Sequence, residues 1–166
     1  MISSSFQACL SDVYKGEILG ESAFDQMLLG AVDSEQIYIL GSLLQFETEG
    51  KAILRPLLVR LGLPIFEDPE SKQAGSAGGN ELNGLPWIER FGSLGDIVRT
   101  QYLPRYLELA TLISAEDEPE AARVAAFMGR HESALVAVAD NVVAGNLDPI
   151  APVVALLNFP LPRPAA

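Results

Sequence analysis

The chain is poor in the residues on which several classes of site depend. It has one cysteine, one histidine, and 11 Lys and Arg residues against 22 Asp and Glu residues, which gives a net charge of −11. A single cysteine, Cys9, excludes an internal disulfide framework and a multi-cysteine zinc site. Nucleic acids and anionic lipid surfaces are bound largely through clusters of Lys and Arg. The sequence has no such cluster, so we expect neither a nucleic-acid partner nor a membrane partner.

Long apolar runs are missing as well. No stretch approaches the roughly 20 consecutive apolar residues that span a bilayer. The first residues, MISSSFQACL, lack the basic and apolar regions of a secretory signal. We therefore expect a cytoplasmic protein. A length of 166 residues with 49% hydrophobic composition predicts one globular domain over residues 1–166.

No segment of useful length shows the alternation of apolar and polar residues that is typical of a β-strand, whereas helical periodicity recurs along the chain. Asp33 and Gln36 resemble a capping box at a helix start, and Gly62 and Gly145 are typical helix stops. Pro104 should kink or break the third segment. The pattern predicts an all-α protein, an antiparallel four-helix bundle. Its main helices are expected at about residues 5–31, 34–61, 86–113 and 118–144.

Two segments lie outside this pattern. Residues 63–84 are rich in Gly, Ser, Pro and charge, and we expect a flexible loop that could serve as a lid. Residues 146–166 form an apolar tail, with a short helix near residues 150–157 and no charge from Pro149 through Pro162. So apolar a tail should cover its own bundle or a second subunit. We expect a homodimer that forms through it.

The second helix carries two opposite charges in the middle of its apolar stripe. At alternating steps of three and four residues, the stripe contains Ile37, Leu40, Leu44, Glu47, Lys51, Leu54, Leu58 and Leu61. Turning Glu47 and Lys51 toward solvent would turn their leucine neighbours outward too. We therefore expect both charged residues in the interior, although the same spacing also suits an ordinary surface ion pair.

Polar residues interrupt two further stripes at mid-length. Glu17 and Glu21 lie in the stripe of the first helix, and His131 lies in that of the fourth, with Glu132 on a neighbouring stripe. Each residue taken singly has a plain structural interpretation, such as a stripe edge or a core histidine. Because a buried unpaired charge costs several kcal/mol, their recurrence on three helices predicts one shared polar layer.

Three segments resemble the ferritin-like superfamily of four-helix bundles. They are GEILGESAFDQML, LLQFETEGKAIL and MGRHESALVAVADNVVAG. The resemblance implies a di-iron or di-manganese centre, with Glu from two helices and Glu-x-x-His from the other two. By position, Glu21 or Glu17 corresponds to the ligand of the first helix, Glu47 to the glutamate of the second, and His131 to the histidine of the fourth. Gly50 stands where the histidine of the second helix is expected.

Two functions follow from these residues. In the first, the protein is an enzyme acting on a small organic molecule. If iron or manganese is bound, the reaction is oxidative and the candidate ligands are Glu17, Glu21, Glu47, His131 and Glu132. Without metal, Glu47 and His131 are acid–base candidates, and Lys51 is an electrostatic or Schiff-base candidate. The alternative is a metal-free helical module for binding or self-assembly. Interior carboxylates favour the enzyme, because an interaction module has no use for them.

Overall fold

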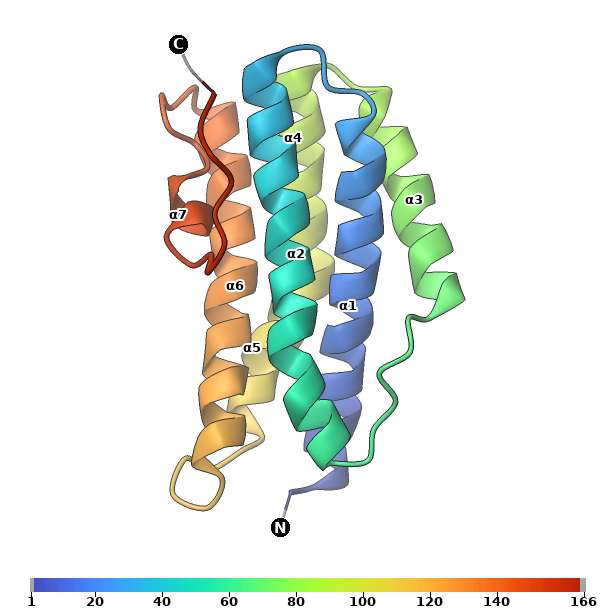
Figure 1. The fold of residues 1–166 in the computed structure, drawn as a ribbon, viewed down its shortest axis with the longest axis vertical. Helices are drawn as coiled ribbons and strands as arrows, with labels where there is room; N and C mark the ends of the chain where they lie inside the picture. The colour runs from blue at the N-terminus through green and yellow to red at the C-terminus, as the bar shows by residue number, and fades with distance from the viewer. Residues whose placement is uncertain (1, 165–166) are drawn as a thin grey trace.

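The structure is a computed structural model that describes residues 2–164. Over these residues it is all-helical, with no strand, and its long helices pack side by side (Figure 1). Successive long helices run in opposite directions along the long axis of the molecule. The elements are α1 (Ser4–Leu28), α2 (Ser34–Arg60), α3 (Pro69–Asn83), α4 (Trp87–Ile97), the π-helical turn η1 (Val98–Tyr102), α5 (Leu103–Thr111), α6 (Pro119–Val143) and α7 (Ala151–Val154).

The predicted start and stop signals act as expected. The backbone N–H of Gln36 donates to Asp33 Oδ1 at 2.8 Å, so Asp33 caps α2. The Gln36 side chain accepts in return from the N–H of Val32, one residue before the cap. Gly62 and Gly145 have φ values of 68° and 71°, a conformation that costs glycine little and ends α2 and α6.

The prediction of a flexible loop over residues 63–84 is wrong for most of its length, because residues 69–83 form α3. Asp68 caps this helix by accepting from the backbone N–H of Ser71 at 3.0 Å, and Pro69 occupies its first turn. The glycines of this segment disfavour a helix, since each costs about 1 kcal/mol relative to alanine. Tertiary packing overrides that cost here.

The glycines of α3 permit a close approach to α1. A Cβ at Gly75 would overlap the carbonyl of Leu19, and a Cβ at Gly79 would overlap that of Ala23. Both pairs are spaced by four residues, so one turn of α3 matches one turn of α1. The two helices lie side by side in Figure 1, with α3 against the outer side of α1. The glycines of α3 thus form the surface through which this helix packs against α1.

Pro104 does disturb the third predicted helix, but it does not end it. The segment continues as α4, η1 and α5, and the N–H of Leu103 donates to the carbonyl of Val98 in the wider π-helical turn. Proline lacks an N–H and its ring crowds the preceding turn. Widening that turn accommodates Pro104, and the chain stays helical from Trp87 to Thr111.

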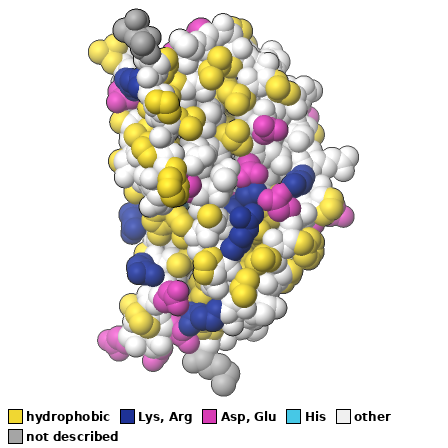
Figure 2. Space-filling view, viewed as in Figure 1, with side chains coloured by type: hydrophobic (Ala, Val, Ile, Leu, Met, Phe, Trp, Pro, Cys, Tyr) yellow, Lys and Arg dark blue, Asp and Glu magenta, His cyan; other side chains and the backbone are white. Residues whose placement is uncertain are grey.

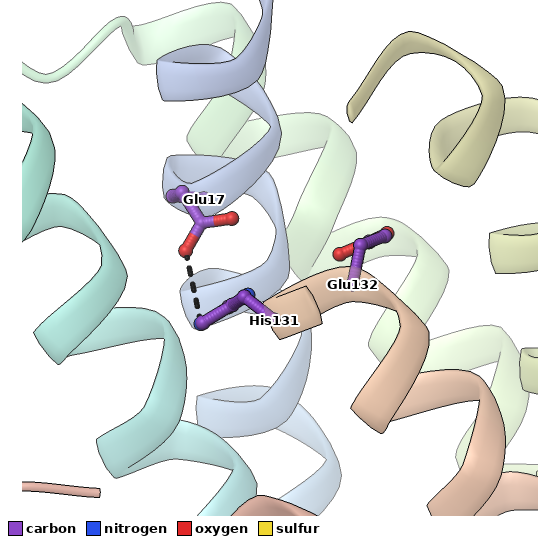
Figure 3. A group of neighbouring side chains, drawn as sticks. All are labelled: Glu17, His131 and Glu132. Carbon is purple, nitrogen blue, oxygen red and sulfur yellow. Dashed lines mark ion pairs between the residues drawn. The ribbon is translucent and has the colours of Figure 1, made fainter. Parts of the chain in front are cut away.

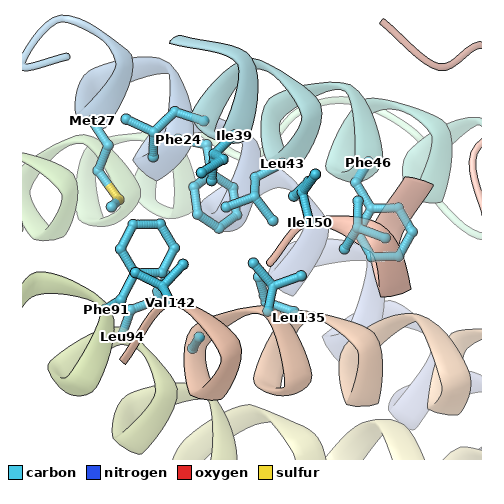
Figure 4. Close-up of a cluster of buried hydrophobic side chains, with 14 of the residues drawn as sticks. Phe24, Met27, Ile39, Leu43, Phe46, Phe91, Leu94, Leu135, Val142 and Ile150 are labelled. Carbon is cyan, nitrogen blue, oxygen red and sulfur yellow. The ribbon is translucent and has the colours of Figure 1, made fainter. Parts of the chain in front are cut away.

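The apolar core consists of two clusters. One contains Phe24, Leu43, Phe91 and Leu135 and is shown in Figure 4. The other contains Phe6, Leu10, Leu58 and Met128, from the opposite halves of the helices. Between them, at mid-length of α1, α2 and α6, lie the buried polar residues Glu17, Glu47, Lys51, His131 and Glu132. The structure therefore has a polar layer in the middle of its core.

The tail packs across its own chain, which is one of the two roles expected for it. Ile150 and Val153 are fully buried in the core. The carboxylate of Glu49, on α2, accepts hydrogen bonds from the backbone N–H groups of Asn158 and Phe159, at 2.7 and 2.8 Å. In Figure 1 the tail runs over α2 and α6. The expected short helix is confirmed but limited to Ala151–Val154.

Among residues 2–164, no helix combines the length and the apolar character needed to cross a bilayer.

Candidate functional site

Glu17, His131 and Glu132 form a buried group in the polar layer. One ligand atom from each lies within 4.8 Å of the others, and the exposed fractions are 0%, 1% and 4%. Figure 3 shows Glu17 on α1 pointing toward His131 on α6, with Glu132 following on the same helix. No Lys or Arg among residues 2–164 forms an ion pair with either carboxylate. The group could therefore hold a metal ion.

His131 is a neutral imidazole with one free nitrogen. Its Nε2 lies 3.1 Å from the carbonyl oxygen of Phe46, which can only accept, so Nε2 carries the proton. Burial lowers the pKa of His131 to about 4. Nδ1 is buried without a partner, and the ring stacks on Phe46 with the centroids 3.7 Å apart. The packing fixes the ring and leaves a lone pair on Nδ1 available.

Glu17 is held by a tyrosine that the sequence reasoning did not select. The Tyr106 hydroxyl, on α5, donates to Glu17 Oε1 at 2.7 Å. The other oxygen, Oε2, lies 3.5 Å from His131 Nε2 and has no hydrogen-bond partner. Burial, together with the charge of Glu17, raises the pKa of Tyr106 well above its usual range, so the hydroxyl stays a donor.

Three carboxyl groups of the layer have raised pKa values. Burial is the main cause for Glu17 and Glu47, and the neighbouring carboxylates add to it. Burial also raises the pKa of Glu132 to about 8. With no cation paired to them among the described residues, these groups must hold protons or bind a cation to remain in the core.

Glu47 and Glu132 also line a cavity of about 500 Å³. The cavity lies between α1, α3, α4, η1 and α6, and most of its lining is apolar or glycine. Glu47 is 2% exposed, and its Oε1 atom has no hydrogen-bond partner. Tyr102 and Tyr106 join the two carboxyl groups in the lining. The carboxyl cluster thus faces a space large enough for a small molecule.

Two glycines make room for the carboxylates. A Cβ at Gly50 would overlap the Glu17 carboxylate and lie 3.0 Å from His131 Nε2. A Cβ at Gly20 would lie 2.5 Å from Glu47 Oε2. In the ferritin-like resemblance, position 50 corresponds to a histidine. Here the Glu17 carboxylate fills the space that this side chain would need.

Lys51 and Glu21 lie apart from this cluster. Lys51 is 3% exposed, as its stripe position predicts, but its ammonium group does not pair with Glu47. It donates to Glu21 Oε1 at 2.8 Å and to Glu67, and these bonds raise its pKa despite its burial. Schiff-base chemistry requires the opposite shift. Through these ion pairs, Lys51 links α2 to α1 and to the segment before α3.

The ion pairs around Lys51 continue to the surface. Glu67 also pairs with Arg55 and Lys72, and about a quarter of its side chain is exposed. Near the middle of the face in Figure 2, basic and acidic side chains lie next to one another, with apolar side chains around them. Glu21 is also about a quarter exposed and accepts from the hydroxyl of Thr48. Of the two candidates on the first helix, Glu17 is therefore the core carboxylate.

Sequence reasoning missed Tyr106 and Tyr102 as polar groups of the site, because both fit the apolar period of their helix. Their hydroxyl groups were the available signal, since a buried Tyr O–H usually finds a polar partner. The acidic residues of that helix, Glu89, Asp96 and Glu108, are exposed and lie outside the cluster. The segment from Trp87 to Thr111 thus contributes two phenol groups and no carboxyl group to the cavity lining.

Comparisons with protein-family models, curated proteins and solved structures find no match to this chain.

Proposed function

We propose that this protein is a ferritin-like helical bundle that binds one iron or manganese ion in its core and oxidises a small organic molecule. The observation that carries the proposal is the buried cluster of Glu17, Glu132 and His131, which has no cationic partner among residues 2–164. In the bundle, α1, α2, α4 with α5, and α6 are the four main helices. Helix α3 is an addition on the outside of α1.

The donor atoms suit such an ion. Glu17 Oε2 and His131 Nδ1 are buried without hydrogen-bond partners, and Glu132 is almost fully buried beside them. Carboxylate oxygens with one imidazole nitrogen are typical ligands of iron and manganese. The chain has a single histidine, and the Glu17 carboxylate fills the space at Gly50. These residues therefore fit one ion better than the pair found in many ferritin-like proteins.

Each side chain has a definite task in this proposal. Glu17, Glu132 and His131 hold the ion, and the Tyr106 hydroxyl orients Glu17 through its 2.7 Å hydrogen bond. Glu47 faces the cavity and can hold or release a proton there. When bound, the ion would supply redox chemistry that no side chain of the cluster has, with an external oxidant such as dioxygen taking up the electrons of the substrate. The apolar walls exclude water from the substrate.

Metal binding tests the proposal directly. The purified chain is dialysed against Fe(II) or Mn(II) without oxygen, and bound metal is measured by elemental analysis. We expect about one ion per chain, because the cluster offers one set of ligands, and loss of binding in Glu17→Gln and Glu132→Gln. Glu89→Gln, an exposed acidic position on α4, is the matched control. If the wild type stays free of metal, or if all three variants bind it equally, the proposal is wrong.

A metal-free binding or assembly module is the second candidate. The raised pKa values of Glu17, Glu47 and Glu132 support it, because protonated carboxyl groups are stable in a core without a metal ion. In this case the cavity binds its ligand without any reaction. A chain that binds no metal but retains ligand binding would favour this candidate.

Homodimerisation through the tail stays a prediction. Phe159 is 73% exposed beside the part of the tail that packs on α2, and could contact a second copy. A cytoplasmic location likewise stays a prediction.

A further inference from the structure

The cavity is open at one side and closed at the end that the Glu47 and Glu132 side chains line. Ala74, Glu81 and Ile97 line it and are themselves exposed, so its mouth lies between α3 and α4. Glu47, Tyr106 and Glu132 line it and are buried. A ligand would therefore enter between α3 and α4 with its polar end toward the carboxyl groups.

The polar side chains of the lining carry either carboxyl or hydroxyl groups. They are the carboxyl groups of Glu47, Glu81 and Glu132 and the hydroxyl groups of Ser93, Tyr102 and Tyr106. No Lys, Arg, His, Asn or Gln lines the cavity. Glu47 Oε1 has no partner, and no hydrogen bond to the Glu132 side chain occurs within residues 2–164. At the closed end, a carboxyl oxygen of Glu47 is thus left without a hydrogen-bond partner among the described residues.

We propose that this cavity binds an apolar amine, with its ammonium group at Glu47 and its apolar body along the passage between α3 and α4. The inference rests on the proposed function in that the cavity is the substrate site, and it names the class of the substrate. An ammonium group has three N–H donors and a positive charge. The ligand would thus supply the N–H donors and the positive charge that are missing at the closed end of the cavity.

Other classes of ligand fit this end less well. A carboxylate or phosphate head would find no cationic side chain in the lining. A neutral alcohol has one O–H donor and no charge, so it cannot form the charge-assisted hydrogen bond of an ammonium group with Glu47. The apolar walls come mainly from leucine, isoleucine, valine and small residues. They suit an aliphatic or otherwise apolar body.

Gly78 provides a way to fill the cavity without disturbing the cluster. It lines the cavity on α3, and a Cβ at this position would meet no atom within 4 Å. Gly78→Phe therefore places a ring at the passage while replacing a poor helix former with a better one. Glu47→Gln removes the carboxylate that would pair with the ammonium group but keeps the shape of the closed end. Together the two variants separate the contribution of the ammonium group to the affinity from that of the apolar body of the ligand.

The test is calorimetric titration of the full chain with octylamine, octan-1-ol and octanoate, at about pH 7 and about 0.15 M salt, where long-range surface attraction is screened. The chain is measured as purified and after dialysis against EDTA. We expect octylamine to bind about tenfold more tightly than octan-1-ol, as a charge-assisted hydrogen bond implies, and octanoate not to bind. Glu47→Gln should remove that preference. Gly78→Phe should weaken both octylamine and octan-1-ol, whereas Glu89→Gln should change neither.

Specific outcomes would overturn the inference. One is octanoate that binds as tightly as octylamine. Another is octylamine binding that is equal in the wild type, Glu47→Gln and Gly78→Phe, which means attraction to the acidic surface only. The EDTA-treated protein separates this result from that of the proposed function. Absence of metal binding with selective octylamine binding rejects the metal-dependent function alone, whereas metal binding without amine selectivity rejects the ligand class alone.

Discussion

The carboxylate of Glu17, on α1, occupies the space that any side chain at Gly50, on α2, would need. This contact brings α1 and α2 together at the level of His131 and fixes where the buried carboxylate lies. It also explains how α1 places a carboxylate in the core at a height where α2 has no side chain. The absence of a side chain at position 50 is therefore part of the site.

Gly50→Ala should disrupt both stability and metal binding. The new methyl group would overlap the Glu17 carboxylate in a closely packed core, and overpacking of this kind costs about 1–3 kcal/mol. We expect a lower free energy of unfolding by urea denaturation and weaker binding of Fe(II) or Mn(II). Gly78→Ala is the matched control, since its methyl group meets open space and should be neutral or stabilising. Equal behaviour of the two variants would contradict this account of Gly50.

Lys51→Met should be far more destabilising than Glu47→Gln. Lys51 is a buried ammonium group between Glu21 and Glu67, and its removal leaves two carboxylates without their partner. We expect a loss of about 3 kcal/mol in the free energy of unfolding, the lower end for a buried pair, because both carboxylates are about a quarter exposed. Glu47 has no ion-pair partner and a raised pKa, so glutamine closely imitates its protonated form. Denaturant unfolding measures the free energy of unfolding of both variants. A larger loss in Glu47→Gln than in Lys51→Met would contradict the prediction.

The metal-free protein should lose stability as the pH rises from about 6.5 to 9. The pKa of Glu132 is about 8 in the folded state against an ordinary value of 4.5, so the folded state binds the proton more tightly. The stability from this group is present at low pH and is lost as the pH rises through 8. His131 acts in the opposite direction, but only below about pH 6.5, because its folded pKa is about 4.

Urea unfolding at several pH values, in the presence of EDTA, measures this effect. Glu132→Gln should flatten the decline above pH 6.5, and a saturating divalent ion should also reduce it, since the ion replaces the protons. A decline of the same size in Glu132→Gln would show that other groups cause it.

Removal of residues 149–166 should lower the free energy of unfolding by about 3 kcal/mol or more, the value expected for exposing the partners of two buried aliphatic side chains. These side chains are Ile150 and Val153, and both are fully buried. The full-length variant Phe159→Ala separates packing from dimerisation, because Phe159 is 73% exposed. It should retain the melting temperature, and its sedimentation should change only if the tail joins two copies. An unchanged melting temperature after the deletion would show that the tail does not stabilise the fold.

The sequence by itself determined the all-α class, most helix boundaries and the burial of Glu47 and Lys51. Each of these depends on local information. Asp33 caps α2 through a bond within one turn, and Gly62 and Gly145 end helices through their own backbone conformation. The apolar stripe of α2 fixes its inward face, because four leucines cannot face the core unless Glu47 and Lys51 do so too.

Only the tertiary structure decided which groups meet. Glu17 and Glu21 are one helical turn apart on the same face, so periodicity could not separate the core carboxylate from the partner of Lys51. Helix α3 is stable because its glycines allow close packing against the backbone carbonyl groups of α1. Intrinsic helix propensity does not include the stabilisation that comes from such a tertiary contact. Tyr106 joined Glu17 across 89 positions of sequence. Such contacts depend on the relative height and rotation of packed helices, which the side chains of all the helices set together.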